Sequence, residues 1–267
     1  APAWIGMAAA ALAFLLVGAG VHMVQTVGLA LATDLARPED RPRVVGLMYT
    51  MLLLGMIVSA VLFGWLLHEF SPGRLIQVIQ GSAVVTVVLN LAALWKQEGR
   101  GARRARPGEA RAPDPTFREA MGGFLRLPNA TGALVVIGLG TMGFGMADVL
   151  LEPYGGQVLG LTVGMTTLLT ALLAAGSLFG FGLASRVLSR GADPIAMAGF
   201  GVLVGIPGFL AILAAAPFGS VVAFGVGTLL VGVGAGLFGH GTLTATMNLA
   251  PPEQAGLALG AWGAVQA

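Results

Sequence analysis

Long runs without a charged residue constrain this chain more than any other feature. Most of these runs reach the roughly 20 apolar residues that a helix needs to cross a bilayer. Only 10% of the 267 residues are charged, whereas roughly 25% is usual for a soluble domain. The pattern predicts an all-α integral membrane protein and excludes a soluble enzyme. The long charge-free runs are 1–33, 44–68, 75–95, 127–147, 153–185, 194–252 and 254–267.

These runs define the membrane-spanning helices that we expect. The run at 194–252 is too long for one crossing, and the Ala-Pro-Phe-Gly-Ser stretch at 216–220 supplies a turn within it. No basic segment precedes the first run, so it is not a signal peptide. Because the chain starts with Ala1 and the last run stops at Ala267, we expect it to be part of a longer protein. The predicted spans are 4–33, 44–67, 75–95, 130–152, 163–186, 194–215, 220–248 and an eighth that begins near 255.

The basic residues are distributed very unevenly between the two ends of these helices. If successive helices alternate in direction, all but one of the 14 Lys and Arg residues fall on one side, and the exception is Arg74. Loops rich in Lys and Arg face the cytoplasm, so this side is predicted to be cytoplasmic. Because topology already explains the basic loops, we expect no nucleic-acid partner.

The segment 96–127 differs in composition from its surroundings, with eight basic and four acidic residues. We predict that it is a cytoplasmic linker. Asp114 and Pro115 are typical of a helix start, and a short amphipathic helix over 114–126 would then lie on the membrane surface. A solvated basic connector remains an equal alternative for 96–112. The apolar face of the helix would consist of Phe117, Met121, Phe124 and Leu125.

An internal repeat indicates the architecture. A shift of 214 positions sets residues 30–40 on 244–254 with four identities, and it also aligns three glycines. The first predicted span thus corresponds to the seventh, as in two six-helix halves of the major facilitator fold. Chance agreement between glycine-rich stretches is the alternative. The chain would then hold about seven and a half of twelve helices: helices 4–6 in 1–95, the linker in 96–127, and helices 7–10 with the start of 11 in 128–267.

Several sequence stretches point to one family within the major facilitator fold. Together they are similar to the PucC/LhaA family, also called the bacteriochlorophyll delivery family, which is a branch of the major facilitator fold in phototrophic bacteria. They are Gly-Val-His-Met-Val-Gln-Thr (20–26), Arg-Leu-Ile-Gln-Val-Ile-Gln-Gly (74–81), Asp-Val-Leu-Leu-Glu-Pro-Tyr-Gly-Gly-Gln-Val-Leu-Gly-Leu (148–161), His-Gly-Thr-Leu-Thr-Ala (240–245) and Gln-Ala-Gly-Leu-Ala-Leu-Gly-Ala-Trp-Gly-Ala-Val-Gln (254–266).

The resemblance implies a light-harvesting complex assembly factor that binds or delivers bacteriochlorophyll to antenna polypeptides. It also implies a location in the inner membrane, cytoplasmic or intracytoplasmic, of a phototrophic bacterium. The expected partners are antenna polypeptides, membrane lipid and, further, pigment-synthesis enzymes.

Three polar residues in the charge-free helices are candidates for pigment binding. His22 and His240 lie nearer the cytoplasmic end, and a neutral imidazole nitrogen can ligate the magnesium of a chlorin. His240 ranks first, because Gly239 and Gly241 would clear space for a flat macrocycle. Gln25 is the third candidate. A plain hydrogen bond between helices is the alternative for each.

Two acidic residues share one face of the fourth predicted span. Asp148 and Glu152 are spaced i, i+4, and acids inside a membrane are costly and therefore functional candidates. They could relay protons, hold a cation or bind a ligand or partner helix. Alternatively, Glu152 reaches water at the interface, which makes Asp148 the stronger candidate. Tyr154 and Gln157 are expected in an outer turn that follows them.

The sequence favours no catalytic function. No HExxH motif, phosphate-binding loop or supported Ser-His-Asp set occurs, so we predict that the chain is not an enzyme. It has no cysteine, and no metal site built from protein ligands is expected. The alternative to an assembly factor is a proton-coupled secondary transporter of a small solute with the same fold. The glycine pairs 176/180 and 232/236 are predicted helix-packing surfaces.

Overall fold

The structure, a computed structural model, describes residues 3–37, 40–95, 117–249 and 255–266. In this part of the chain every regular element is an α-helix, and seven of the helices are long and apolar enough to cross a membrane. The predicted all-α membrane protein is confirmed. The helices are α1 (Ala3–Leu35), α2 (Arg41–Leu66), α3 (Pro72–Leu94), α4 (Phe117–Leu125), α5 (Ala130–Gln157), α6 (Val163–Leu188), α7 (Pro194–Ala215), α8 (Val221–Leu249) and α9 (Ala255–Gln266).

The helix bounds agree with the predicted spans to within a few residues, except in α5. Helix α7 covers 194–215 as predicted, and the turn expected at 216–220 separates it from α8. Helix α5 continues to Gln157 instead of ending at residue 152. It passes through Pro153, which removes one N–H donor from the helix, and membrane helices tolerate that loss.

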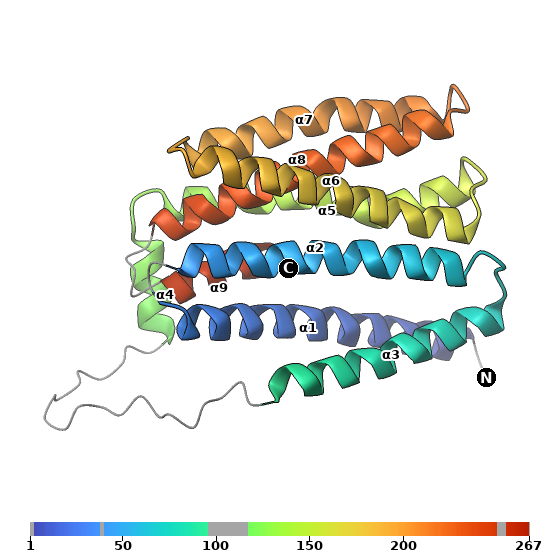
Figure 1. The fold of residues 1–267 in the computed structure, drawn as a ribbon, viewed down its shortest axis with the longest axis horizontal. Helices are drawn as coiled ribbons and strands as arrows, with labels where there is room; N and C mark the ends of the chain where they lie inside the picture. Colours follow the sequence, from blue (N-terminus) through green and yellow to red (C-terminus); the bar gives the residue numbers. More distant parts are fainter. Residues whose placement is uncertain (1–2, 38–39, 96–116, 250–254, 267) are drawn as a thin grey trace, which may run out of the picture.

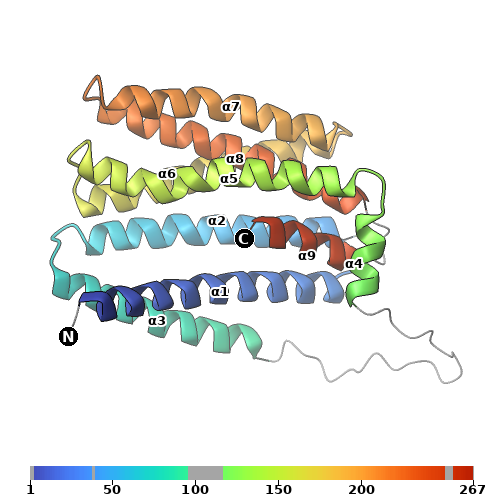
Figure 2. The same cartoon turned by 180° about the vertical axis from the view of Figure 1, so that it is seen from behind.

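Glycine-lined contacts hold the second part of the chain together. Helix α8 lies between α6 and α7, with α5 beside them (Figures 1 and 2). The predicted packing surfaces of α6 and α8 face each other, because a Cβ atom added to any of their four glycines would overlap the backbone of the opposite helix. Only residues without side chains allow backbones to approach so closely. These four glycines are Gly176, Gly180, Gly232 and Gly236.

Helix α2 connects the first three helices to this packed group. Near one end, a Cβ added to Gly164 of α6 would lie 2.9 Å from the carbonyl oxygen of Gly64. Near the other end, the rings of Tyr49 and Phe181 stack with centroids 5.9 Å apart. Helix α3 has no buried residue, and α1 exposes most of its large apolar side chains. In a membrane these faces lie against lipid or further protein.

The short helix α4 crosses one end of the bundle (Figures 1 and 2). Phe124 is fully buried against alanines of α5 and α9, and Met121 packs beside it. Leu125, expected on the same face, is 43% exposed. The predicted amphipathic helix is therefore present, and its apolar face docks on the protein's own helices. The predicted cap and the rest of the linker before residue 117 lie outside the described residues.

The helix ends follow the predicted repeat. Leu249, the end of α8, follows Leu35, the end of α1, by 214 positions, and Ala255, the start of α9, follows Arg41, the start of α2, by the same 214. All four ends lie at the side of the bundle that carries α4 (Figure 1). The repeated segments therefore fold alike. The division into two halves and the twelve-helix fold stay predictions.

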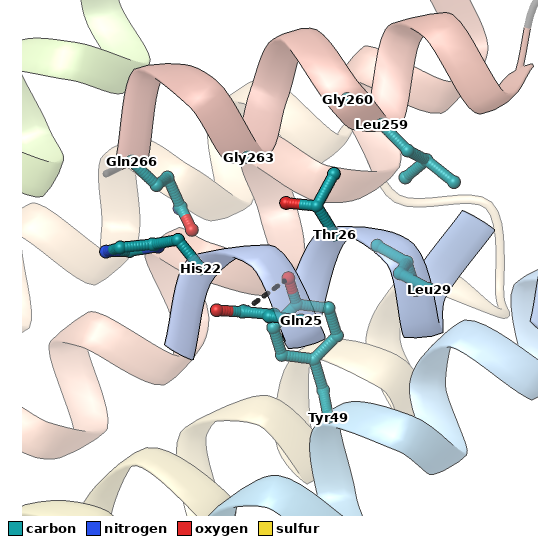
Figure 3. A pocket seen from close by; sticks show the side chains of 9 residues that line it. All are labelled: His22, Gln25, Thr26, Leu29, Tyr49, Leu259, Gly260, Gly263 and Gln266. Carbon is teal, nitrogen blue, oxygen red and sulfur yellow. Dashed lines mark hydrogen bonds between the residues drawn. The ribbon is translucent and has the colours of Figure 1, made fainter. Parts of the chain in front are cut away.

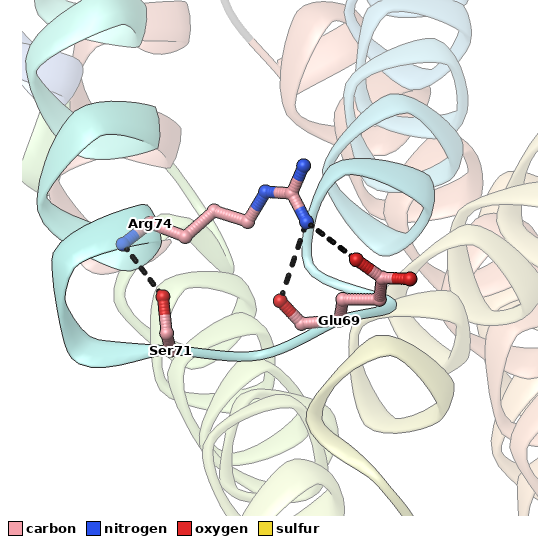
Figure 4. Close-up of polar contacts among 3 residues, drawn as sticks. All are labelled: Glu69, Ser71 and Arg74. Carbon is pink, nitrogen blue, oxygen red and sulfur yellow. Dashed lines mark hydrogen bonds and ion pairs between the residues drawn. The ribbon is translucent and has the colours of Figure 1, made fainter.

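The connection between α2 and α3 lies at the side of the bundle opposite α4. It contains Glu69 and Ser71, which contact Arg74, the one basic residue that the alternating helices place on this side (Figure 4). Its Nη1 atom lies 3.5 Å from Oε2 of Glu69 and 3.4 Å from the carbonyl oxygen of Glu69. The hydroxyl of Ser71 accepts a hydrogen bond from the Arg74 N–H at 3.2 Å and caps α3. Because Glu69 balances its charge, Arg74 adds no net positive charge to this side.

Candidate functional site

A polar cleft of about 200 Å³ lies between α1, α2 and α9 (Figure 3). We call it the α1/α9 cleft. With histidine neutral, no lining residue carries a formal charge, yet side chains able to donate or accept hydrogen bonds come from all three helices. The polar lining residues are His22, Gln25, Thr26, Tyr49 and Gln266, and the others are Leu29, Leu259, Gly260 and Gly263.

Tyr49 is the best-anchored side chain of this cleft. The Gln25 amide donates a hydrogen bond to the Tyr49 hydroxyl at 3.4 Å. The Tyr49 ring also packs edge-on against Trp262 of α9, with centroids 5.6 Å apart, and the Trp262 N–H donates to the Thr242 hydroxyl at 3.2 Å. The alternative given for Gln25, a hydrogen bond between helices, is thus present. Gln25 also lines the cleft, which its second predicted role, pigment binding, requires.

His240 lines a second, smaller cleft of about 80 Å³, which we call the α2/α8 cleft. Its ring meets Phe181 of α6 edge-on, with centroids 4.1 Å apart. The Nδ1 atom of His240 is buried and has no hydrogen-bond partner in the part of the chain that the structure describes. A buried polar atom of this kind needs an explanation. The cleft is lined by Val45, Gly46, His240, Leu243, Thr244, Met247 and Asn248.

The space predicted beside His240 exists on one side only. A Cβ added to Gly239 would meet nothing within 4 Å, whereas at Gly241 it would lie 2.7 Å from the carbonyl oxygen of Pro194 and the nitrogen of Ala198. The expectation for Gly241 is therefore wrong, because this glycine admits the start of α7. Open space for a flat ring remains beside Gly239.

The two acidic candidates have different surroundings. Oε1 of Glu152 accepts a hydrogen bond from the Thr170 hydroxyl of α6 at 2.9 Å. Asp148 is exposed and makes no hydrogen bond or ion pair with any residue that the structure describes. Asp148 is thus the acid whose carboxylate is free to bind a ligand, an ion or another helix.

Tyr154 and Gln157 lie in the last turn of α5, not in a turn after it. The expected outer turn is wrong, because Pro153 does not end the helix. The ring of Tyr154 packs on Phe224 of α8, with centroids 5.7 Å apart. Tyr154 therefore contributes to the contact between α5 and α8, while Gln157 is exposed at the helix end.

The histidines and the acids belong to separate sites. At a rise of about 1.5 Å per residue, His22 lies about 20 Å along α1 from the side that carries α4, and Asp148 lies about 27 Å along α5 from the same side. The neighbours also differ: the clefts involve α1, α2, α8 and α9, whereas Glu152 bonds α6.

Three lining residues of the α1/α9 cleft were missed from the sequence. Thr26 lies four positions after His22 and so shares its helix face, a signal that was available. Tyr49 and Gln266 come from other helices, and no local pattern marks them. Only the packing of α1, α2 and α9 brings them to His22 and Gln25.

The helices and clefts define a multi-pass α-helical membrane protein with an uncharged polar cleft where its repeated segments meet. The chain belongs to the PUCC protein family, whose family model matches residues 1–267. The expected family is thereby confirmed.

Named relatives come from phototrophic bacteria. The whole chain is 64% identical to Protein PucC of Rhodovulum sulfidophilum and covers 59% of it. It is 62% identical to Protein PucC of Rhodobacter capsulatus and covers 58% of that protein. A more distant relative, 28% identical over 96% of this chain and 60% of its own length, is named Bacteriochlorophyll synthase 44.5 kDa chain, also from Rhodobacter capsulatus. The chain thus spans about three fifths of the length of these curated relatives.

Proposed function

We propose that this chain is part of a light-harvesting complex assembly factor that binds bacteriochlorophyll and delivers it to antenna polypeptides. Membership of the PUCC family and a distant relative named for bacteriochlorophyll support the class of ligand. The observation that carries the proposal is the α1/α9 cleft, which combines uncharged polar side chains with apolar ones and is set among exposed apolar helices. We place the protein in the inner membrane, with the linker 96–127 in the cytoplasm because the basic residues gather on that side.

The residues present fit a magnesium-containing chlorin. Such a pigment needs apolar surroundings, a nitrogen ligand for its magnesium and donors for its carbonyl groups. His22 is exposed in the cleft, and His240 has an unpartnered Nδ1, so either imidazole can supply the nitrogen. The Gln25 amide can supply a donor. These residues bind and orient a pigment, and the proposal includes no catalytic step.

The absorption spectrum of the gently purified full-length protein tests this function. Protein from pigment-producing cells should carry bacteriochlorophyll in a fixed ratio, and organic solvent should extract it. An unrelated membrane protein with the same purification tag is the control for pigment that sticks to detergent. A colourless protein, or one with no more pigment than the control, would exclude the proposal.

A proton-coupled transporter of a small solute is the second candidate. One observation favours it, namely the exposed carboxylate of Asp148, which has no partner within the described residues. The same spectrum separates the two functions, because a small-solute transporter would purify without pigment.

A further inference from the structure

The internal repeat relates the two clefts to each other, so each lies at an equivalent contact between two helices. The repeat shift of 214 positions carries residues that line one cleft onto residues that line the other. The four leucine and valine residues among them are buried in a single cluster, which both clefts adjoin. The helix pairs α1/α9 and α8/α2 are thus equivalent across this cluster. The equivalent pairs are Thr26 with His240, Leu29 with Leu243, Val45 with Leu259 and Gly46 with Gly260.

The polar side chains are present in only one of the two copies. Glycine occupies the position 214 residues after His22, Gln25 and Tyr49 in each case. The α2/α8 cleft therefore lacks these groups and holds about 80 Å³, whereas the α1/α9 cleft holds about 200 Å³. Two of these side chains also serve packing, because Tyr49 contacts the rings of Phe181 and Trp262 and Gln25 donates a hydrogen bond to Tyr49. His22 lines the cleft and makes no hydrogen bond with any residue that the structure describes, so packing leaves this side chain unexplained.

We propose that the α1/α9 cleft binds the carbonyl-bearing edge of a bacteriochlorin ring, whose flat body lies along α1 over Gly18. This inference rests on the proposed function and specifies its site. The cleft has amide and hydroxyl groups but no charged lining residue, which suits a neutral ligand with hydrogen-bonding groups. Since sites that enclose a whole drug-sized ligand measure about 300–1,000 Å³, a cleft of about 200 Å³ admits only an edge.

Gly18 supplies the flat surface for the rest of the ring. It lies one helical turn before His22, on the same face of α1, and a Cβ added there would meet nothing within 4 Å. Among the residues that the structure describes, nothing covers the backbone at this point, which leaves room for a planar group. The His22 imidazole stands between this surface and the cleft, where its nitrogen can reach the centre of a ring whose edge meets Gln25.

Matched glycine substitutions on α1 test the site. Gly20 is equally open but lies on the opposite face of the helix from His22. Bacteriochlorophyll a is titrated into pigment-free full-length protein in detergent, and the Kd is measured by fluorescence quenching. Gly18→Leu should weaken binding at least tenfold, and Gly20→Leu should leave it unchanged. Equal monodispersity and equal melting temperature of the two variants show that both fold.

Polar variants extend the test to the cleft itself. Gln25→Leu and Tyr49→Phe should each weaken binding about threefold to tenfold, the loss of one hydrogen bond. Thr244→Val, in the other cleft, should leave the Kd unchanged. Bacteriopheophytin, which lacks magnesium, shows whether His22 acts by ligating the metal or only by fitting the ring. If it ligates the metal, His22→Phe should weaken binding of bacteriochlorophyll but not of bacteriopheophytin.

Two results would overturn the inference in distinguishable ways. If the unchanged protein binds bacteriochlorophyll and both Gly18→Leu and Gln25→Leu bind it equally well, the pigment lies elsewhere and only the site is wrong. If the unchanged protein binds no bacteriochlorophyll, the proposed function fails together with its site.

Discussion

Leu29 of α1 and Leu243 of α8 are separated by 214 positions and are buried in the same apolar cluster. Equivalent side chains of the repeat thus belong to one cluster in the folded chain. Trp262 of α9 and Ile137 of α5 also belong to this cluster, so it joins the repeated helices to the rest of the bundle. Residues of this cluster line both clefts.

Backbone contact between α6 and α8 predicts which glycines tolerate a methyl group. In Gly180→Ala the new Cβ would overlap the backbone of Val233, whereas in Gly182→Ala it meets nothing within 4 Å. Gly180→Ala should lower the free energy of unfolding by about 1–3 kcal/mol. Gly182→Ala should leave it unchanged or raise it by up to about 1 kcal/mol, because alanine favours helices. Unfolding in detergent measures both, and equal stabilities would contradict the described packing.

The docking of α4 depends on Phe124. Its fully buried ring contacts α5 and α9, so Phe124→Ala should cost about 3–5 kcal/mol of local packing energy and release the helix. Trypsin should then cut faster at Arg118 and Arg126. Leu125→Ala, at a side chain that is 43% exposed, is the matched control. If both variants are cut at the rate of the unchanged protein, α4 is held by other contacts.

Topology can be tested without background, because the chain has no cysteine. Single cysteines at Gly101, in the linker, and Gly73, in the first turn of α3, should react with a membrane-impermeant reagent from opposite faces of the membrane. Gly101 should be reached from the cytoplasmic face. Labelling of both sites from one face would show that the alternation of the helices is wrong.

Substitutions of Glu152 and Asp148 should have different effects on the yield of light-harvesting complex in cells. Glu152→Gln keeps an acceptor for the Thr170 hydroxyl, so light-harvesting complex yield should fall little. Asp148→Asn removes a carboxylate that has no partner among the described residues, and the yield should fall severalfold because such an acid is retained for a ligand or partner. The yield is measured from whole-membrane absorption. An unchanged yield in Asp148→Asn would remove Asp148 from the functional site.

The positions of the helices could be predicted from the sequence because the charge and hydrophobicity of nearby residues determine where a membrane helix begins and ends. A span such as 194–215 is bounded by Asp193 and by the turn at 216–220, and both signals can be read directly. The end of α5 was misjudged for a related reason. Pro153 breaks helices in water, and the sequence alone does not show that neighbouring helices make its missing hydrogen bond tolerable.

The site was only partly predictable because it depends on which helices meet. His22 and Gln25 are visible as polar residues in an apolar helix, but Tyr49 and Gln266 join them only through packing. The ranking of His240 relied on space at Gly239 and Gly241. The structure shows that Gly241 instead receives α7, a contact between segments more than forty residues apart in sequence.

Pigment transfer tests the central claim, delivery of bacteriochlorophyll to antenna polypeptides, most directly. The full-length protein is loaded with bacteriochlorophyll and mixed in detergent with pigment-free antenna polypeptides, and the red shift of the pigment absorption is followed over time. The shift should develop faster than from the same amount of free pigment, and Gly18→Leu should abolish this advantage. A red shift no faster than that from free pigment would contradict delivery.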